Sequence, residues 1–484
     1  MSVVSTVDIE KKSLLSLSET ISAVSGKCIC SEIGKCSFYF NSVVTDSRNV
    51  CEGSLFVPLV GEFQDGHKFV VSAIEKGASV VFVDQTSCDC LNILLSELIE
   101  EHPYVVFIVV RNTLHALQLL AARYVEKFPN LKKIAVTGSS GKTTTKEMIA
   151  SVLSNKFNVV INEGNLNSET GLPLSVFKIR PEHEIGVFEM GMNRKGEIAE
   201  LATVLKPSYA VITNIGTAHI GMLGSQDAIA YEKKQVFSFF DDSNVAFIPK
   251  NDKYVDFLKE NLKGKIIEYG ENQNVCDVKS EGLNGTSFIY KNIQIQLPLP
   301  GYGNFLDSLA AIAVAEEFGF NVSEIKNGIE NIKPLFGRSQ ILIGKATVIQ
   351  DCYNANPDSM EQALDFMKSL IVSKNRKIAV IGDMLELGSD SKKAHKNVFD
   401  KVLECNFTFV VFVGEEFYSV VEDEKSKNNK LENIFCYKHY TDESIETVKN
   451  LLNSKIKDND VVLLKGSRGI RLERLTSYII GEVK

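Results

Sequence analysis

The segment KIAVTGSSGKTTTK, residues 133–146, has the pattern of a strand that runs through a glycine-rich turn into a helix. Gly138 and Gly141 let backbone N–H groups approach phosphate oxygens, and the N-terminus of the helix adds the positive end of its dipole. Lys142 can reach the β- and γ-phosphates of a nucleotide, and the Thr143 hydroxyl can ligate Mg²⁺. The predicted phosphate-binding residues are Thr137, Gly138, Ser139, Ser140, Gly141, Lys142, Thr143 and Thr144.

The general phosphate-loop pattern GxxxxGK[ST] differs from this segment at one position, where the chain has Val136 instead of glycine. A chance glycine-rich turn is the alternative interpretation. The strand–turn–helix context and the Lys-Thr pair favour the phosphate loop.

Length and composition indicate a multidomain globular protein. At roughly 150 residues per domain, the 484 residues predict three domains, and the 44% hydrophobic and 24% charged residues are ordinary for folded proteins. The 53 Lys and Arg against 61 Asp and Glu give a net charge of −8, which argues against a nucleic-acid partner. We find no secretion signal and no run of 18 apolar residues, so we expect a cytoplasmic protein without a transmembrane segment.

Ten cysteines are scattered along the chain, which in a cytosolic protein indicates reduced thiols. Cys28 and Cys30 form one tight pair, and Cys88 and Cys90 form the other. Zinc sites usually have two to four residues between cysteines or a histidine nearby, so buried or idle thiols are the favoured interpretation and a zinc site is the alternative.

The order of apolar runs and turns predicts an α/β protein with three domains, comprising residues 1–110, 111–334 and 335–484. In the first, residues 69–75 predict a helix and residues 80–83 a strand. In the second, strands alternate with helices, which predicts a parallel sheet. The third repeats this alternation and predicts a Rossmann-like doubly wound sheet. Residues 421–430, a mixed charge run, are expected to be a solvated loop.

Two polar residues follow predicted strands of the second domain. Glu189 ends the run IGVFE, and His219 follows YAVITNIGTA. Ligands of open α/β sheets bind outside the carboxyl ends of the strands, so both side chains are candidates for the nucleotide site. Mg²⁺ prefers oxygen ligands, which makes Glu189 the natural one; His219 is a weaker candidate, and a loop histidine is its alternative interpretation.

Eight segments in order complete a recognisable set: TGSSGKTTTK, GNLNSETGLP, EMGMNRKGEIAEL, NIGTAHIGMLGS, FGRSQ, DCYNANPDSM, GDMLELG and LKGSRG. Together with TDSRNVCEGSLFVPLVGEFQDGHKF near the N-terminus, they extend from about residue 43 to about residue 470 and closely resemble the Mur ligases. The resemblance is closest to the branch that adds D-alanyl-D-alanine to UDP-N-acetylmuramoyl-tripeptide, and the NANP segment in particular is similar to that branch.

This resemblance implies an N-terminal UDP-sugar-binding domain, a central P-loop-type ATPase domain and a C-terminal Rossmann-like ligase domain. It implies an ADP-forming peptide ligase of peptidoglycan synthesis that uses ATP and Mg²⁺, makes an acyl-phosphate and works as a monomer. The implied catalytic residues are Lys142, Glu189, His219, Lys233 and Arg338. The implied metal ligands are Thr143, Glu189, His219 and, if it is carbamylated, Lys233.

The resemblance also implies binding residues. Those for the UDP substrate are Thr45, Asp46, Ser47 and Arg48, for which an Asp-Ser turn capped by arginine is the alternative. Those for ATP are Asn304, Arg338 and Asp351 beside the phosphate loop, and those near the amine substrate are Asn354, Asn356, Lys465, Ser467 and Arg468.

Several positions keep a second interpretation. Asn304 resembles an adenine-contacting residue, but it could instead cap a helix. The family pattern there is nearer GRHNVxNALAA, and this chain departs from it at Tyr302, Gly303 and Asp307. Lys233 resembles a lysine that several members carry as a carbamate, and it could equally remain cationic and bind phosphate.

Other functions remain as alternatives. A diaminopimelate-adding ligase or a folylpolyglutamate-synthetase-like ligase would share the phosphate loop. A folylpolyglutamate-synthetase-like ligase should lack the TDSR and DGH segments, and this chain has both. A P-loop nucleotide switch is disfavoured by Val136 and by the absence of an NKxD-type guanine reader. A scaffold with a degraded site is disfavoured by the presence of Lys142, Thr143, Glu189 and Arg338.

Overall fold

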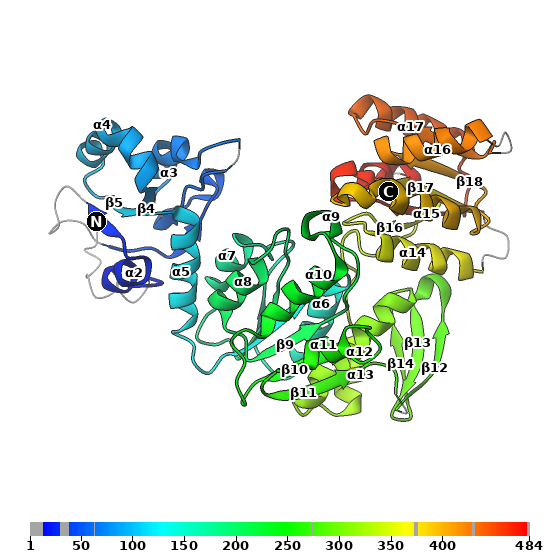
Figure 1. Ribbon diagram of the computed structural model, residues 1–484, viewed down its shortest axis with the longest axis horizontal. Coiled ribbons are helices and arrows are strands. Elements are labelled where there is room, and N and C mark those ends of the chain that lie inside the picture. Colours follow the sequence, from blue (N-terminus) through cyan, green and yellow to red (C-terminus); the bar gives the residue numbers. More distant parts are fainter. Residues whose placement is uncertain are drawn as a thin grey trace. The chain divides into compact units, whose positions relative to one another are not determined.

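The computed structural model describes residues 13–29, 38–61, 63–272, 274–371, 376–427 and 431–481, with the backbone alone for residues 87–94. The chain forms two compact units. Figure 1 labels the helices and strands along the chain. The first comprises Met1–Ile134, Asn158–Met192 and Glu197–Ser208, and the second comprises Ala135–Phe157, Asn193–Gly196 and Tyr209–Lys484. In the described part of the chain, no helix has both the length and the apolar character needed to cross a bilayer.

The N-terminal part is a small α/β fold, as predicted. Its five-stranded sheet has the order β1-β5-β4-β3-β2, with every pair parallel except β1 with β5. The strands are β1 Lys27–Ile29, β2 Ser42–Val44, β3 Ser54–Phe56, β4 Ala78–Asp84 and β5 Val106–Val110. The helices are α2 Leu17–Val24, α3 Val70–Glu75, α4 Gln85–Glu101 and α5 Thr113–Val125, with 3₁₀ turns η1 Ser47–Asn49 and η2 Gly66–Phe69. The predicted helix over 69–75 and strand over 80–83 are therefore confirmed.

The central six-stranded sheet has the order β11-β10-β9-β6-β8-β7. Its strands are β6 Lys132–Thr137, β7 Val159–Ile161, β8 Ile185–Glu189, β9 Tyr209–Ile212, β10 Val245–Pro249 and β11 Lys265–Tyr269. The pairs β7–β8, β9–β10 and β10–β11 are parallel, as the alternation of strands and helices predicted. The helices are α6 Lys142–Leu153, α7 Gly171–Val176, α8 Glu197–Leu205, α9 Ile220–Leu223, α10 Gln226–Lys234, α11 Val255–Lys259, α12 Tyr302–Glu317 and α13 Val322–Glu330, with 3₁₀ turns η3 Gln235–Phe237 and η4 Gly282–Asn284.

A separate three-stranded antiparallel sheet precedes α12 and was not predicted. Its strands are β12 Val275–Ser280, β13 Thr286–Tyr290 and β14 Ile293–Leu297, in sequence order. Lys291 and Asn292 connect β13 to β14 with φ of 46° and 66°. Two successive residues with positive φ are typical of a two-residue hairpin turn. The prediction for residues 111–334 depended on strands that alternate with helices, and this hairpin joins two strands directly.

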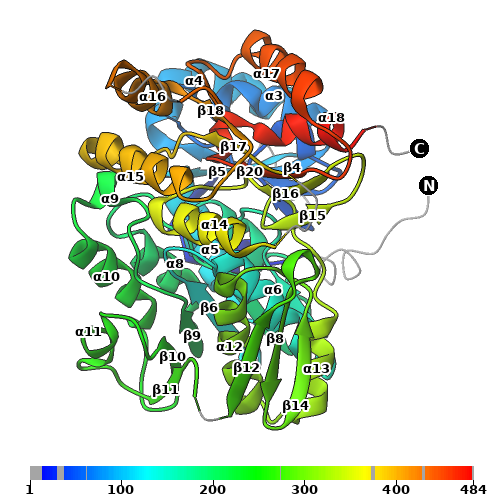
Figure 2. The same ribbon diagram turned by 90° about the vertical axis from the view of Figure 1, so that its right-hand side faces the viewer.

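The C-terminal sheet confirms the doubly wound prediction. Its order is β15-β16-β20-β17-β18-β19, parallel except for the edge strand β15. Alternate strand residues belong to two cores: Ile381 and Phe412 pack with α14 and α15, and Val380 and Val411 pack with α17 and α18 (Figure 2). The strands are β15 Gln340–Leu342, β16 Thr347–Asp351, β17 Lys377–Gly382, β18 Phe409–Val413, β19 Ile434–Tyr437 and β20 Val461–Lys465. The helices are α14 Pro357–Ser369, α15 Ser391–Leu403, α16 Glu415–Lys427, α17 Asp442–Lys455 and α18 Thr476–Ile480, with 3₁₀ turns η5 Gly388–Asp390, η6 Arg468–Ile470 and η7 Leu472–Leu475.

The charge run at residues 421–430 is not the loop that was predicted. Helix α16 extends to Lys427, and Val421 is buried in the C-terminal core. The charges pair one turn apart along this helix, as in Glu424 with Lys427 at 3.0 Å, so the run covers a helix surface. Residues 428–430 lie outside the described part, and the domain boundaries at 110 and 334 stay a prediction.

Candidate functional site

The loop between β6 and α6 is shaped by the end of the neighbouring segment after β9. The Thr213 hydroxyl donates to the Ser140 carbonyl at 2.6 Å, and the Ser140 N–H donates to Asn214 Oδ1 at 3.2 Å. Gly141 has φ of +77°, in the left-handed region that glycine adopts without strain. Thr213 and Asn214 were not among the predicted site residues, although Asn214 begins one of the quoted motifs.

Two lysines converge on one carbonyl of this loop. Lys142 Nζ donates to Gly138 O at 2.9 Å, and Lys233 Nζ donates to the same oxygen at 2.8 Å. Lys233 is 1% exposed. Burial, reinforced by the charge of Lys142, holds the pKa of Lys233 well below its usual value. The loop therefore concentrates two nitrogen donors where phosphate oxygens, which are stronger acceptors than a carbonyl, could replace Gly138 O.

Further hydroxyl groups lie at the start of α6 and at the end of β6. Thr143 and Thr144 are buried in the first turn of α6, and Thr137 is buried at the last position of β6. The Ser139 hydroxyl accepts a hydrogen bond from the Gly216 N–H at 2.8 Å. The predicted phosphate-loop residues thus form one continuous strand–turn–helix segment.

Asp307 of α12 packs against this loop and was not predicted as a site residue. A Cβ placed on Gly141 would lie 2.2 Å from Asp307 Oδ1, so the carboxyl group takes the space beside the glycine. Burial raises the pKa of Asp307 to about 8, although Thr145 and Arg338 act in the opposite direction. The signal in the sequence that could have identified Asp307 was its departure from the GRHNVxNALAA pattern.

Asn304 does not cap its helix. Helix α12 begins at Tyr302, with Gly301 at the N-cap position, and Asn304 Nδ2 donates to the Pro300 carbonyl at 2.7 Å. The capping alternative is therefore wrong: the side chain satisfies a backbone carbonyl just before the helix.

Glu189 belongs to the first unit and is held there by asparagines. It is 1% exposed, and Asn167 Nδ2 donates to its Oε1 at 2.6 Å. Asn162 accepts from the Glu189 N–H at 2.8 Å and donates to its carbonyl at 3.0 Å. Asn167 comes from the quoted GNLNSETGLP motif, so that motif orients the carboxylate.

His219 contacts an acidic residue of the C-terminal part of the second unit. Its Nδ1 lies 2.7 Å from Glu386 Oε2, at angles outside those of a hydrogen bond. Approach of the imidazole nevertheless lowers the pKa of Glu386, against the effect of burial. His219 has φ of +63°. Glu386, from the GDMLELG motif, is thus a partner that sequence reasoning missed.

Charged groups gather at the carboxyl ends of β16 and β20, which are neighbouring parallel strands. Asp351 Oδ2 lies 2.8 Å from Lys465 Nζ, and Asp351 Oδ1 accepts from the Ser339 N–H at 3.1 Å. Lys465 Nζ also donates to the Asn354 carbonyl at 3.1 Å. The structure therefore brings Asp351, Asn354 and Lys465 together.

Two arginines stack on the ring of Tyr353. The Arg338 guanidinium lies 4.4 Å from the ring centroid and that of Arg468 lies 5.8 Å from it. Arg468 also lies 5.3 Å from the Phe336 ring and pairs with Glu473 at 2.9 Å. Cation–π contact of this kind orients a guanidinium without neutralising it.

Two other candidates have structural hydrogen bonds. Asn356 is the N-cap of α14, with its Oδ1 accepting from the Ser359 N–H at 2.8 Å. Ser467 Oγ is buried and accepts from the Leu385 N–H at 2.9 Å. These contacts explain their residue types without a ligand.

In the N-terminal part, residues 45–48 form an Asp-Arg turn. The Asp46 carboxylate accepts from the Arg48 N–H at 2.9 Å and from Arg48 Nη2 at 2.6 Å. These hydrogen bonds lower the pKa of Asp46 to about 2. The Arg48 side chain is 85% exposed, Thr45 is partly buried, and the Ser47 carbonyl accepts from Lys76 Nζ at 3.0 Å.

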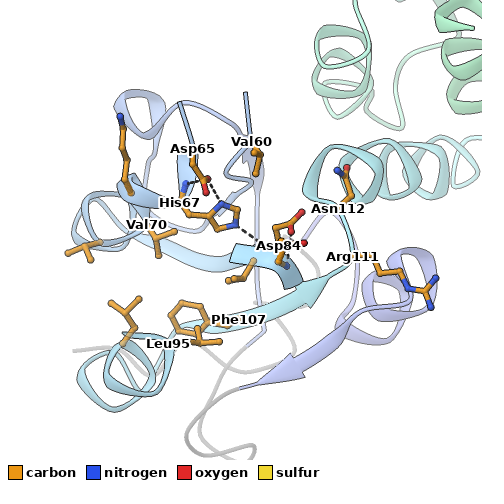
Figure 3. Close-up of a pocket in the computed structure, with 14 residues that line it drawn as sticks. Val60, Asp65, His67, Val70, Asp84, Leu95, Phe107, Arg111 and Asn112 are labelled. Atoms are coloured by element: carbon orange, nitrogen blue, oxygen red, sulfur yellow. Dashed lines mark hydrogen bonds and ion pairs between the residues drawn. The ribbon is translucent and has the colours of Figure 1, made fainter. Parts of the chain in front are cut away.

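A pocket of about 740 Å³ lies in the same part of the chain (Figure 3). His67 Nδ1 lies 2.6 Å from Asp65 Oδ1, and its Nε2 accepts from the Asp84 N–H at 2.9 Å. These contacts assign the ring proton to Nδ1 and make His67 a fixed, neutral part of the wall. The apolar lining includes Val60, Val70, Leu95, Leu98 and Phe107.

Within the described residues, no group of three histidine, cysteine or carboxylate side chains converges to hold a metal ion by itself. Cys28 is partly buried. Cys30 and the side chains of Cys88 and Cys90 lie outside what the structure describes, so the zinc alternative at those pairs is not tested.

Comparisons with known proteins cover almost the entire chain. Three family models match: the Mur ligase family catalytic domain over residues 39–125, the Mur ligase middle domain over 136–315 and the Mur ligase glutamate ligase domain over 337–468. The chain is 41% identical to a UDP-N-acetylmuramoyl-tripeptide–D-alanyl-D-alanine ligase of Treponema pallidum over 476 residues, which cover 96% of this chain and 98% of the relative.

Solved structures agree in fold. A crystal structure of MurF from Acinetobacter baumannii matches with a TM-score of 0.81 at 29% identity, covering 96% of this chain and 98% of the other. MurF ligase from Thermotoga maritima, solved in complex with ADP, matches with a TM-score of 0.74 at 26% identity, covering 90% and 96%. Each likeness extends over all three expected domains.

Proposed function

Because the chain belongs to the Mur ligase family, we propose that it is the ADP-forming ligase that adds D-alanyl-D-alanine to UDP-N-acetylmuramoyl-tripeptide in peptidoglycan synthesis. The observation that carries this proposal is the 41% identity to a relative with that activity over 96% of this chain. The phosphate loop with its two convergent lysines supplies the equipment that ATP use requires.

The reaction has two steps. The terminal carboxylate of the tripeptide attacks the γ-phosphorus of ATP, which forms an acyl-phosphate and releases ADP. The amine of D-alanyl-D-alanine then attacks the acyl carbon, loses a proton and expels inorganic phosphate. Phosphoryl transfer requires mainly positioning and charge neutralisation, because two anions must meet. We assign this work to Lys142, Arg338 and the loop N–H groups.

The remaining site residues enter the proposal by their chemistry. We assign ATP to residues 137–144 with Asn304 and Asp351, and the UDP substrate to residues 45–48, where the exposed Arg48 guanidinium suits a pyrophosphate. The pocket beside His67 offers that substrate an apolar wall. Lys465 and Arg468 are assigned to the neighbourhood of the amine substrate, together with Asn354, Asn356 and Ser467.

Magnesium is part of the proposal. Thr143 offers a hydroxyl and Glu189 an oriented carboxylate, which is the oxygen chemistry that Mg²⁺ prefers. His219 contacts Glu386 in this structure, so it is the weaker candidate. Bound by such oxygen ligands, Mg²⁺ would offset charge on the phosphate oxygens. Carbamylation of Lys233 requires an unprotonated amine, and its lowered pKa supports that state.

We further propose that the enzyme works in the cytoplasm as a monomer on these three small substrates, without a nucleic-acid partner. The net charge of −8 supports the last point.

Phosphate release tests the proposed function. The purified chain should release phosphate only when ATP, Mg²⁺, UDP-N-acetylmuramoyl-tripeptide and D-alanyl-D-alanine are all present. Release with a single amino acid in place of the dipeptide would indicate another ligase of the superfamily, and hydrolysis without an acceptor would indicate a nucleotide switch. An ¹⁸O label in the tripeptide carboxylate should appear in the inorganic phosphate, since the acyl-phosphate oxygen leaves with it.

Replacing Lys142 by alanine tests the phosphate loop. We expect turnover to fall by roughly 10²- to 10³-fold, because one preorganised cation is lost from the transition state. Binding of the UDP substrate should remain measurable. Lys132→Ala, at the exposed start of the same strand, is the matched control. Normal turnover in Lys142→Ala would refute the role assigned to Lys142.

A further inference from the structure

The carboxyl group of Asp307 touches the backbone of the phosphate loop. Asp307 is 9% exposed, and a Cβ on Gly141 would meet its Oδ1 at 2.2 Å and its Oδ2 at 2.8 Å. No side chain can therefore lie between the carboxyl group and the turn that starts α6. Whatever charge Asp307 carries is placed directly beside the N-terminus of that helix.

A hydroxyl group of α6 faces the same carboxyl group. Thr145 Oγ1 is buried and has no aligned hydrogen-bond partner among the described residues, yet it lies close enough to act on the ionisation of Asp307. A protonated carboxyl group can both donate to and accept from a hydroxyl, whereas a carboxylate can only accept. Thr145 lowers the pKa of Asp307, so burial rather than this hydroxyl favours the protonated form.

Burial influences the pKa of Asp307 more than the charged groups around it do. Arg338 attracts the carboxylate form, but burial outweighs it and raises the pKa of Asp307 to about 8. Tyr269, on β11, is buried with its own pKa raised well above the usual value, so it adds no charge. On α6, Lys142 is bound to Gly138 O and Lys146 pairs with Glu147 at 2.9 Å.

We propose that Asp307 is a positioning residue that supports the phosphate loop as a neutral carboxylic acid, and that loss of its proton weakens nucleotide binding. The inference rests on the proposed function, since it concerns the nucleotide that the ligase uses. The N-terminus of α6 attracts anions, and a carboxylate beside Gly141 would compete with the phosphates for that end of the helix.

Affinity for ADP, measured by calorimetry on the full chain at about pH 7 and about pH 9, tests the inference. We expect the wild-type affinity to fall by roughly three- to tenfold across this range, as a new charge near the phosphates would require. Asp307→Asn should remove most of that fall. Lys233, which touches the same loop, is present in both proteins, so the difference between them reports Asp307.

Glu317→Gln is the matched control. Glu317 ends the same helix, pairs with Lys265 at 2.6 Å and undergoes the same carboxyl-to-amide change. This variant should keep the wild-type pH dependence. An equal fall in Asp307→Asn and wild type would overturn the inference while leaving the proposed function intact. Absence of ADP binding at every pH would overturn both.

A second readout needs no variant. Binding of an anion beside Asp307 favours its protonated form, so wild-type protein should take up protons when it binds ADP at about pH 8.5. Calorimetry in two buffers of different ionisation enthalpy measures this uptake. Binding without proton uptake would refute the inference even if Asp307→Asn failed to fold.

Discussion

Replacing Asp383 by alanine should loosen the first turn of α16. Asp383 directly follows β17 and is 4% exposed. Its carboxylate accepts hydrogen bonds from the Glu416 and Phe417 N–H groups, both at 3.0 Å. It thus caps the helix from a distant part of the chain. A lost cap costs about 1 kcal/mol, and each buried donor left without a partner costs roughly 1–3 kcal/mol. We therefore expect a loss of roughly 2–4 kcal/mol.

Hydrogen exchange read by mass spectrometry measures this loss locally, which matters because a multidomain chain need not unfold in one step. Peptides from residues 415–427 should exchange roughly 30- to 1,000-fold faster in Asp383→Ala, since about 1.4 kcal/mol is a factor of ten. Asp390→Ala is the control: Asp390 is exposed and makes no cap bond at the start of α15. Equal exchange in the two variants would refute the capping role.

Three further predictions follow from packing and charge. The pKa of Asp307 is raised from 3.8 to about 8, so between these pH values the folded chain holds a proton that the unfolded chain has lost. The free energy of unfolding should therefore fall between about pH 4 and pH 8, by at most about 1.4 kcal/mol per pH unit. Urea titrations of Asp307→Asn should lack this part of the pH dependence, and an identical pH dependence in both proteins would contradict the prediction. Gly328→Ala should lower the melting temperature, because its Cβ would lie 2.4 Å from Val152 Cα and overpacking costs roughly 1–3 kcal/mol; an unchanged or higher melting temperature would count against this packing. Tyr353→Leu should raise KM for ATP several-fold, because the Arg338 guanidinium loses the aromatic ring on which it stacks. Tyr353→Phe keeps the ring and should leave KM unchanged. Equal KM values in the two variants would show that the ring does not position Arg338.

Local patterns predicted most of the regular structure. The helix expected over residues 69–75 is α3 Val70–Glu75, and the strand expected over 80–83 lies within β4 Ala78–Asp84. The phosphate loop was also predictable, because glycines, a lysine and a strand–helix transition lie within 14 residues. These features depend on the periodicity of side chains and on turn residues close together in the sequence.

The predictions failed where a distant partner or a weak local signal decided the outcome. The charge run around Val421 had the composition of a loop, but burial of one apolar side chain in the C-terminal core stabilises it as a helix. The alternative interpretation of Asn304 as a helix cap is also wrong, because the helix begins two residues earlier at Tyr302. The hairpin of β13 and β14 depended on two residues with positive φ.

By itself the sequence determined the α/β alternation, the phosphate loop and the motifs that resemble the Mur ligases. Only the tertiary structure decided that Lys233 shares the Gly138 carbonyl with Lys142, and that Asp307 packs on Gly141. The physical reason is distance along the chain. Residues 95 positions apart, as Lys233 and Gly138 are, meet only when helices pack on a sheet, and burial at that meeting point then lowers the pKa of Lys233.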